Sequence, residues 1–413
     1  SKYHQVTLMR ISTQQLFNRG LEAIQDVQSD QQKTQLQIST GKKVLTPADD
    51  PVASTRILEL NQELELNSQF QRNIELARGH LNLQDDLLGS INSVVQRIRE
   101  LTVTAGNGVL NKSDLSAIST EVKERLSQLA GLMNSQDASG EYLFSGFQGG
   151  TEPFQQNVSG TYVYQGDEGR RFVQVEPNVT IASSENGKQI FQDIAVDKNT
   201  FYTAANPHNQ AVPEARITTG QVIDQELYDQ FYPGDMIVTF TSPSEFNVTD
   251  KATGRSYLAN QAYSQNDPIV VNGVQFEITG TPTAGDSFFI ESTEKQGVLS
   301  TIEKFIYTLD NFTATEEGRA TFDANLESAL INLDSAETSI LEARSQIGAR
   351  LNTVETTEEQ LKDVELLTEQ TLSDLESVDY AEAVSLLSLQ QFTLEAAYSS
   401  YSQVSSLSLF DRL

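Results

Sequence analysis

The stretch that decides the fold is residues 326–354, which read LESALINLDSAETSILEARSQIGARLNTV. Its apolar side chains recur at alternating steps of three and four residues with one slip, and alanine takes alternate positions over most of the stretch. This spacing is typical of one face of a long helix, and the alanines let a second helix approach closely. We therefore expect a coiled-coil-like seam in a helical domain, formed by Leu333, Ile340, Ile347 and Leu351.

Proline separates this flank from the centre of the chain. Of ten prolines, eight lie between Pro153 and Pro282, and the other two are Pro47 and Pro51. Proline lacks an N–H donor and clashes with the preceding turn, so it breaks helix interiors. The flanks can therefore be long helices, whereas the centre cannot. The centre instead contains short β-branched and aromatic runs, such as 162–164, separated by Gly, Asn and Pro, which predict strands.

These patterns predict an α+β fold, in which long N- and C-terminal helices form a coiled-coil or helix-bundle domain around an inserted β-rich domain. The predicted parts are an inner N-terminal helix (1–46), a helical domain in two parts (47–150 and 296–375), the β-rich domain (151–295) and a C-terminal helix (376–413). We expect two small units in the β-rich domain, 151–203 and 216–293, joined by a looser stretch.

Both ends of the chain carry an apolar stripe at helical spacing. The N-terminal stripe lies on a glutamine-rich helix that would be marginal alone, because helices gain most stability by packing an apolar face. The C-terminal stripe runs almost to the last residue, where chains normally fray, so it needs a docking surface. The N-terminal helix and further copies of the chain are the candidates. We assign to assembly Phe17, Leu21, Ile24, Leu387, Leu394, Tyr398, Tyr401, Val404 and Leu407.

An inter-domain loop is predicted between the first two helices. Gly41 suits a helix C-terminus, and Asp50 followed by Pro51 suits an N-cap with proline at the first helical position. Pro47 and Asp49 complete the loop. Simple capping explains these residues, and a hinge role needs further evidence.

Composition excludes several function classes. The chain has no cysteine, so it forms no disulfide or thiolate site. Its net charge of -29 argues against binding nucleic acid, which needs a basic patch. No HExxH, phosphate-loop or GxSxG motif occurs. We therefore expect no enzyme activity, cofactor or metal. We also expect no signal peptide and no membrane insertion, because apolar runs are too short.

Several ordered segments resemble the terminal regions of bacterial flagellins and their hook-associated relatives. The opening Met9–Thr13 and the ending Phe410–Leu413 are more similar to the hook–filament junction members of this family than to filament flagellin. The other matching segments are Ser39–Lys43, Pro47–Ala53, Arg97–Leu101, Ala105–Gly108, Tyr142–Gly146, Ala343–Leu351 and Ser406–Phe410.

The resemblance implies a structural adaptor of the bacterial flagellum, a ring layer that joins the hook, through the first hook-associated protein, to the flagellin filament. Implied partners are copies of the chain, that protein, flagellin and a cytoplasmic export chaperone. Family members are secreted by type III export without signal-peptide cleavage. Two alternatives stay open: a filament-forming flagellin, and a surface adhesin carried on flagellar-type helices.

Overall fold

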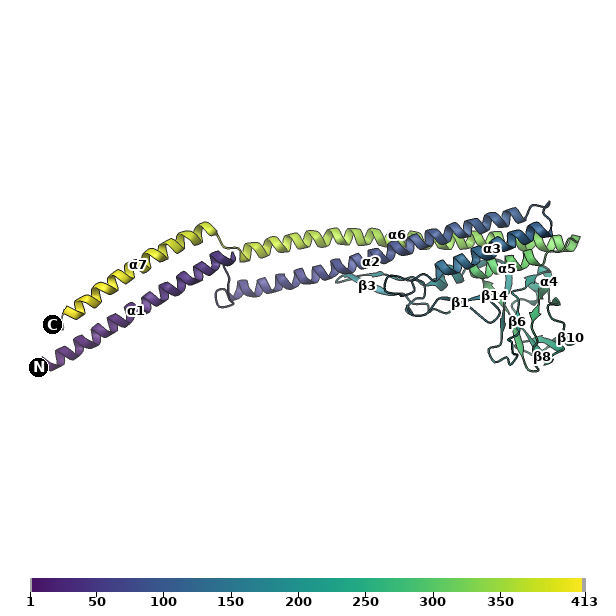
Figure 1. The fold of residues 1–413 in the computed structure, drawn as a ribbon, viewed down its shortest axis with the longest axis horizontal. Helices are drawn as coiled ribbons and strands as arrows, with labels where there is room; N and C mark the ends of the chain where they lie inside the picture. The colour runs from purple at the N-terminus through teal and green to yellow at the C-terminus, as the bar shows by residue number, and fades with distance from the viewer. Residues whose placement is uncertain (1, 411–413) are drawn as a thin grey trace. The chain divides into compact units, whose positions relative to one another are not determined.

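The computed structural model describes the backbone of residues 2–410 and the side chains of residues 14–403, 405 and 406. The chain divides into two compact units. The first joins Ser1–Arg72 to Glu358–Leu413, and the second is Asn73–Thr357. The strands named below all lie in the second unit (Figure 1). Each unit thus contains chain from both flanks.

The flanks form long helices, as the sequence predicts. On the N-terminal side they are α1 (Lys2–Thr40), α2 (Pro51–Ala105) and α3 (Lys112–Met133). On the C-terminal side they are α5 (Val298–Asp310), α6 (Glu316–Glu376) and α7 (Tyr380–Phe410).

Side-chain caps fix where two of these helices begin. The Asp50 carboxylate accepts the N–H of Ala53 at 2.9 Å, which confirms the N-cap predicted in front of α2. Asn111 accepts the N–H of Asp114 at 3.1 Å, while the Asp114 carboxylate accepts the N–H of Asn111 at 2.9 Å. This reciprocal capping box starts α3 and satisfies donors that would otherwise lack a partner.

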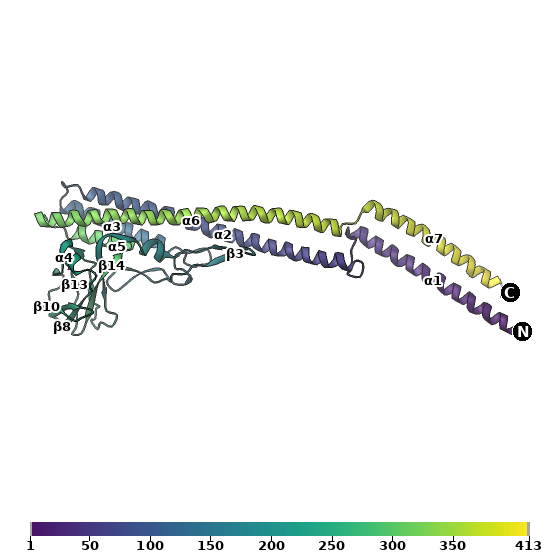
Figure 2. The same cartoon turned by 180° about the vertical axis from the view of Figure 1, so that it is seen from behind.

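In the second unit, α2 and α6 run antiparallel and side by side (Figure 1, Figure 2). Leu333, Ile340 and Ile347 of α6 are fully buried, and Leu351 is half-buried. The facing stripe of α2 is also fully buried and consists of Ile74, Ala77, Leu81, Leu88, Ile91, Val95 and Ile98. The seam that the sequence predicts is therefore the helical core of this unit.

Polar contacts at the rim of the seam hold the two helices in register. Arg344 donates to Asp85 at 2.9 Å, and Gln96 donates to Glu337 at 2.7 Å. Two shorter helices, α3 and α5, pack against each other beside the seam. Ser119 of α3 donates to Asp310 at the end of α5, at 2.6 Å.

The insert between α3 and α5 is antiparallel β structure with one short helix, α4 (Gln225–Phe231), and a π-helical turn, η1 (Lys188–Gln192). Two hairpins come first, β1 (Phe154–Gln156) with β2 (Tyr162–Tyr164) and β3 (Phe172–Glu176) with β4 (Val179–Ala182). A five-stranded sheet follows, in the order β10 (Ser256–Ala262), β9 (Glu245–Asp250), β8 (Met236–Ser242), β14 (Ser287–Lys295), β5 (Ala195–Ala205). Smaller sheets pair β11 (Ile269–Val271), β12 (Val274–Phe276) and β7 (Gln221–Val222), and β13 (Ile278–Thr279) with β6 (Arg216–Ile217).

The five-stranded sheet differs from the predicted division of the insert. The sequence predicts that one β unit ends at residue 203 and that the next begins at residue 216. In the structure, β5 crosses that boundary and pairs along its length with β14, from Ala195 opposite Lys295 to Ala205 opposite Phe288. The division fails because strand pairing across ninety residues leaves no local signal in the sequence. A single aromatic and aliphatic core, which includes Phe201, Tyr228 and Phe288, joins these strands.

A buried acid connects this core to the helices. The Tyr307 hydroxyl of α5 donates to the Glu277 carboxylate, with oxygen–oxygen distances of 2.7 and 2.6 Å. The Glu277 side chain also accepts from Thr218 at 3.1 Å. Burial and the neighbouring carboxylate raise the pKa of the Tyr307 hydroxyl. The phenol therefore stays protonated and continues to donate to Glu277. This contact connects α5 to the residue between β12 and β13.

Within residues 2–410, no helix has the length and apolar character needed to cross a membrane. The α+β class and the layout of terminal helices around a β-rich insert are confirmed.

Shortening a buried side chain tests how much the seam contributes to the free energy of unfolding. We expect Ile340→Ala to lower the free energy of unfolding by about 2–5 kcal/mol, because it removes buried methyl groups and leaves a cavity. The neighbouring Leu341 is 46% exposed, so Leu341→Ala should change stability by no more than about 0.5 kcal/mol. Urea unfolding followed by circular dichroism measures both, and equal losses would contradict the assigned seam.

Candidate assembly site

The first unit contains the terminal helix pair, α1 and α7. The two helices run antiparallel and lie close enough for Cα atoms to approach within 8 Å. The rings of Phe17 and Tyr401 pack with centroids 4.9 Å apart. Beyond Phe17, the face of α1 toward α7 is only weakly apolar, since it includes Gly20, Ile24, Val27, Gln31 and Thr34. The small and polar members allow close approach but bury little apolar surface.

Helix α7 carries large apolar side chains on several sides, between serine, threonine and glutamine residues. Ala383 is buried against the pair, and Leu387, Leu394 and Tyr401 are half-buried on the same face. Large apolar side chains point away from that face in several directions and are exposed in this chain: Val384, Leu386, Leu389, Phe392 and Tyr398. Glu395 is the single charged residue between 383 and 410. A helix with large apolar side chains on several sides and almost no charge normally packs against more than one neighbour, and α1 covers one side.

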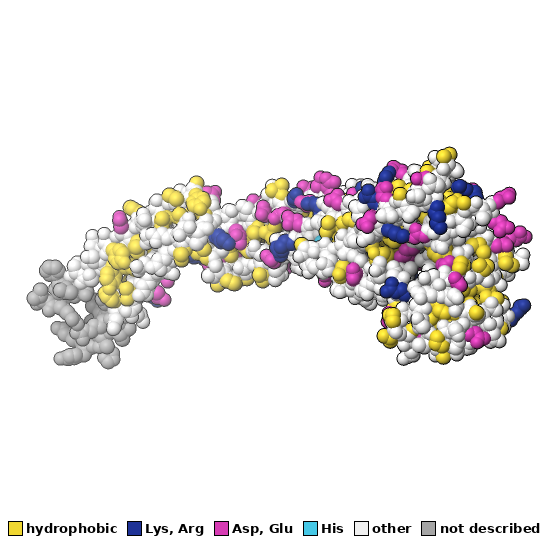
Figure 3. Space-filling model, turned by 45° about the vertical axis from the view of Figure 1, so that its right-hand side comes forward, with side chains coloured by type: hydrophobic (Ala, Val, Ile, Leu, Met, Phe, Trp, Pro, Cys, Tyr) yellow, Lys and Arg dark blue, Asp and Glu magenta, His cyan; other side chains and the backbone are white. Residues whose placement is uncertain are grey.

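Helix α1 has its own exposed apolar side chains. Leu16 is 66% exposed, and Phe17, Leu21 and Leu36 are exposed as well. Figure 3 shows hydrophobic side chains in yellow over the coloured part of this pair, with few charged groups among them. Contiguous exposed apolar surface of this kind marks an interaction site.

A joint connects the terminal pair to the helices α2 and α6 of the same unit. The chain breaks its helix at the same level on both sides, and the two breaks hydrogen-bond to each other. The N–H of Lys43 donates to the Glu376 carbonyl at 2.7 Å, and the N–H of Val378 donates to the Gly41 carbonyl at 2.9 Å. Lys42 adds an ion pair to the Glu376 carboxylate at 3.0 Å. We call residues 41–43 and 376–378 the paired joint.

Gly41 is required by the backbone of the paired joint. Its φ is +72°, and a Cβ at this position would lie 3.0 Å from the Tyr380 hydroxyl. A residue with a side chain would be strained in this left-handed conformation. The predicted helix stop at Gly41 is confirmed.

Asp49 organises the predicted loop. One carboxylate oxygen accepts the N–H of Thr46 at 2.8 Å and that of Leu45 at 3.1 Å, while the other pairs with Lys33 at 2.6 Å. The Lys33 ammonium, followed by these backbone N–H groups, lowers the pKa of Asp49 to about 2. The loop that contains Pro47 is thereby fixed to α1. The loop folds around the Asp49 carboxylate and is tied to α1 through Lys33. These contacts support a capping role for the loop residues rather than a hinge.

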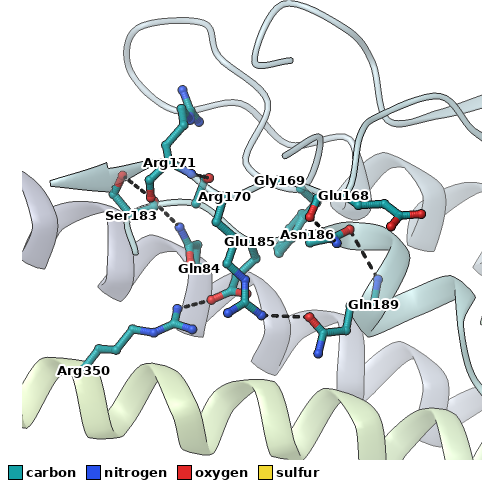
Figure 4. A network of polar contacts seen from close by, with 12 residues as sticks. Gln84, Glu168, Gly169, Arg170, Arg171, Ser183, Glu185, Asn186, Gln189 and Arg350 are labelled. Atoms are coloured by element: carbon teal, nitrogen blue, oxygen red, sulfur yellow. Dashed lines mark hydrogen bonds and ion pairs between the residues drawn. The ribbon is translucent and has the colours of Figure 1, made fainter. Parts of the chain in front are cut away.

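In the second unit, a buried acid ties the segment after β4 to both long helices (Figure 4). The Glu185 side chain is 2% exposed and pairs with Arg350 of α6 and with Arg170, the latter at 3.5 Å. Gln84 of α2 donates to the carbonyl of Ser183 at 2.7 Å. The insert is therefore attached to the bundle by charge as well as by apolar packing.

The structure places the predicted assembly residues on two different surfaces. Ile24, Leu387, Leu394 and Tyr401 lie toward the partner helix of the pair, and Phe17 contacts Tyr401 while remaining 40% exposed. Leu21 and Tyr398 are exposed at 41% and 50%. The side chains of Val404 and Leu407 lie outside the described residues. Leu389 and Phe392 are also exposed on α7, outside the single stripe predicted from the sequence. The near absence of charge between 383 and 410 was the signal that could have found them.

Comparison with known proteins places this architecture in a family. The model of the bacterial flagellin N-terminal helical region matches residues 11–149, and that of the C-terminal helical region matches residues 330–412. Flagellar hook-associated protein 3 of Salmonella typhimurium is 26% identical over 402 residues, which cover 97% of this chain and 99% of that protein. The crystal structure of the flagellar junction protein FlgL from Legionella pneumophila is 30% identical, with a TM-score of 0.50 and coverage of 78% of this chain and 100% of that one.

The chain belongs to the family of flagellar hook-associated protein 3. Members of this family are structural components of the bacterial flagellum that join its hook to its filament. Flagellins are more distant: the flagellin of Escherichia coli is 30% identical over 92 residues, which cover 22% of this chain and 18% of that protein. In this chain, the paired joint, α7 and α1 from residue 11 onward lie in the regions that the flagellin models match.

The Asp49 contacts predict a pH dependence. Because the folded-state pKa of about 2 lies below the ordinary value of 3.8, Asp49 stabilises the loop above pH 3.8. This stabilisation is lost as the pH falls from about 4 toward 2. We expect Asp49→Asn to remove this part of the acid-induced loss of helix, measured by far-ultraviolet circular dichroism between pH 5 and pH 2. The exposed Asp363→Asn in the same unit is the control and should leave the acid transition unchanged.

The Glu185 contacts predict a larger effect in the second unit. Glu185→Leu leaves Arg350 without its buried carboxylate, which should cost about 3–5 kcal/mol of unfolding free energy. The exposed pair of Arg99 and Asp334 is the matched control, and Asp334→Asn should cost at most about 1 kcal/mol. Urea unfolding separates the two variants. Equal, small losses would show that the Glu185 pairs do not hold the insert.

Proposed function

We propose that copies of this chain form a ring layer between hook and filament, with the terminal pair, α1 and α7, as the main contact between copies. The observation that carries the proposal is α7 itself. It exposes large apolar residues in several directions and bears one charge over 28 residues, 383–410. Each copy therefore needs neighbours to cover what its own α1 leaves open.

The two ends of the ring have different proposed partners. On the hook side the partner is the first hook-associated protein, and on the filament side it is flagellin. The match to a hook-associated protein 3 over nearly the full chain supports a junction role, whereas E. coli flagellin matches over less than a quarter of the chain. A junction adaptor is therefore favoured over a filament-forming flagellin.

We also propose export of the unfolded chain without a cleaved signal peptide, with a cytoplasmic chaperone that covers the terminal segments before export. The weakly apolar seam between α1 and α7 supports this order of events. A pair that is only marginally stable alone can remain unfolded until neighbouring copies supply the missing apolar contacts.

One charged substitution on the exposed surface of α7 tests the proposed assembly contact. Phe392 is 70% exposed in the isolated chain, so Phe392→Asp should leave the monomer folded. In the ring, the aspartate would be buried without a partner, which is costly enough to block assembly. We expect unchanged circular dichroism of the purified monomer and loss of swimming in a strain that carries the variant.

The control introduces the same charge outside the terminal pair. Val109 is 87% exposed in the turn between α2 and α3, and Val109→Asp should preserve swimming. Normal motility of the Phe392→Asp strain would contradict the proposed surface. Electron microscopy of the purified wild-type protein tests the alternative, because long filaments grown from this chain alone would favour a flagellin.

A further inference from the structure

A pocket of about 280 Å³ lies in the second unit, apart from the terminal pair. It opens where the β1–β2 hairpin, β5 and α5 meet. Its lining residues come from the hairpin (Asn157, Thr161, Tyr162 and Val163), from β5 (Tyr202, Thr203 and Ala204) and from α5 (Ser300, Glu303 and Lys304), together with Gln192 and Thr219. None of these residues takes part in the proposed assembly contacts.

The pocket has aromatic walls on two sides. Tyr162 comes from the hairpin and Tyr202 from β5. Tyr202 is 49% exposed and the neighbouring apolar Val163 is 38% exposed, so solvent reaches both side chains. The Tyr202 hydroxyl donates to Glu291, which is itself paired with Lys251. These contacts hold the Tyr202 ring in place, so this wall is formed before any ligand arrives.

Two ionisable side chains supply polar groups to the pocket. The Glu303 carboxyl accepts the N–H of Tyr162 at 2.8 Å. The Lys304 ammonium donates to the Phe201 carbonyl at 2.6 Å and to the Thr200 hydroxyl at 3.0 Å. A carboxyl group can accept more than one hydrogen bond, so Glu303 retains capacity for a ligand. The Lys304 Nζ also lies 4.0 Å from the centroid of the Phe201 ring, and these contacts fix it in the wall of the pocket.

Charge is disfavoured at this position. Desolvation raises the pKa of Glu303 to about 8 and lowers that of Lys304 to about 7. Near neutral pH, Glu303 is thus mostly protonated and Lys304 is partly neutral. Neither side chain supplies a full counter-charge near neutral pH, so the pocket disfavours a strongly charged ligand.

We propose that this pocket binds one neutral sugar ring. A pyranose has an apolar C–H face that can lie against Tyr162 or Tyr202 and hydroxyl groups that both donate and accept. Asn157 also lines the pocket, and its side-chain oxygen accepts the N–H groups of Ser159 and Thr161, which leaves its NH₂ group as the hydrogen-bond donor of this side chain. The combination of flat aromatic surface and mixed donors and acceptors fits such a ligand.

The experiment is saturation-transfer difference NMR with the full-length chain at pH 7. The neutral probes are the methyl glycosides of glucose, galactose, mannose and N-acetylglucosamine, and the charged probes are glucosamine and glucuronic acid. We expect saturation of at least one neutral probe and of neither charged one. Absence of signal from all four neutral probes, or stronger signal from a charged probe, would overturn the proposal.

Variants locate the signal. Tyr202→Ala and Glu303→Ala should abolish it, whereas Glu303→Gln, which keeps a neutral hydrogen-bonding group, should retain most of it. Phe172 is 61% exposed on β3 and outside the pocket, so Phe172→Ala is the matched aromatic control and should leave the signal unchanged. Circular dichroism confirms that each variant is folded. Persistence of the signal in both folded alanine variants would place sugar binding elsewhere and refute this site.

Discussion

The antiparallel seam between α2 and α6 is the interaction on which the second unit depends. It joins residues that are about 240 to 260 positions apart, such as Gln96 with Glu337 and Asp85 with Arg344, and so closes the chain around the insert. Closing a loop of this length has a large entropic cost, which the fully buried aliphatic stripe of both helices offsets. The Glu185 pairs and the Tyr307–Glu277 contact then attach the insert to a bundle that is already closed.

The first unit is built on a different balance. Its α1 face contributes Gly20, Gln31 and Thr34 where the seam of the second unit has fully buried Leu and Ile, so the terminal pair gains much less from its own packing. At the same time it exposes more large apolar side chains than a monomer normally tolerates. One chain thus combines a unit with a fully buried helical seam and a unit whose terminal helices leave large apolar side chains exposed.

The helical part of the fold could be predicted because its signals are local. Steps of three and four residues identified Leu333, Ile340 and Ile347, and the Asp50–Pro51 cap located the start of α2. The pairing of β5 with β14 could not be predicted, since the partners lie ninety residues apart and short strands carry no mark of their neighbour. For α7 the sequence correctly predicts a helix, but the predicted stripe covers only part of its apolar surface. The large apolar side chains of α7 lie on several sides, so a search for one stripe finds only some of them.

The paired joint has a consequence for how copies could be stacked. Two backbone hydrogen bonds cross between residues 41–43 and 376–378, so α1 cannot slide along α7 without breaking both. The joint therefore fixes the axial register of the two terminal helices. It sets the position of each exposed apolar side chain on one helix relative to those on the other. Identical copies would then present their contacts at identical levels, and a closed ring would need no adjustment within each member.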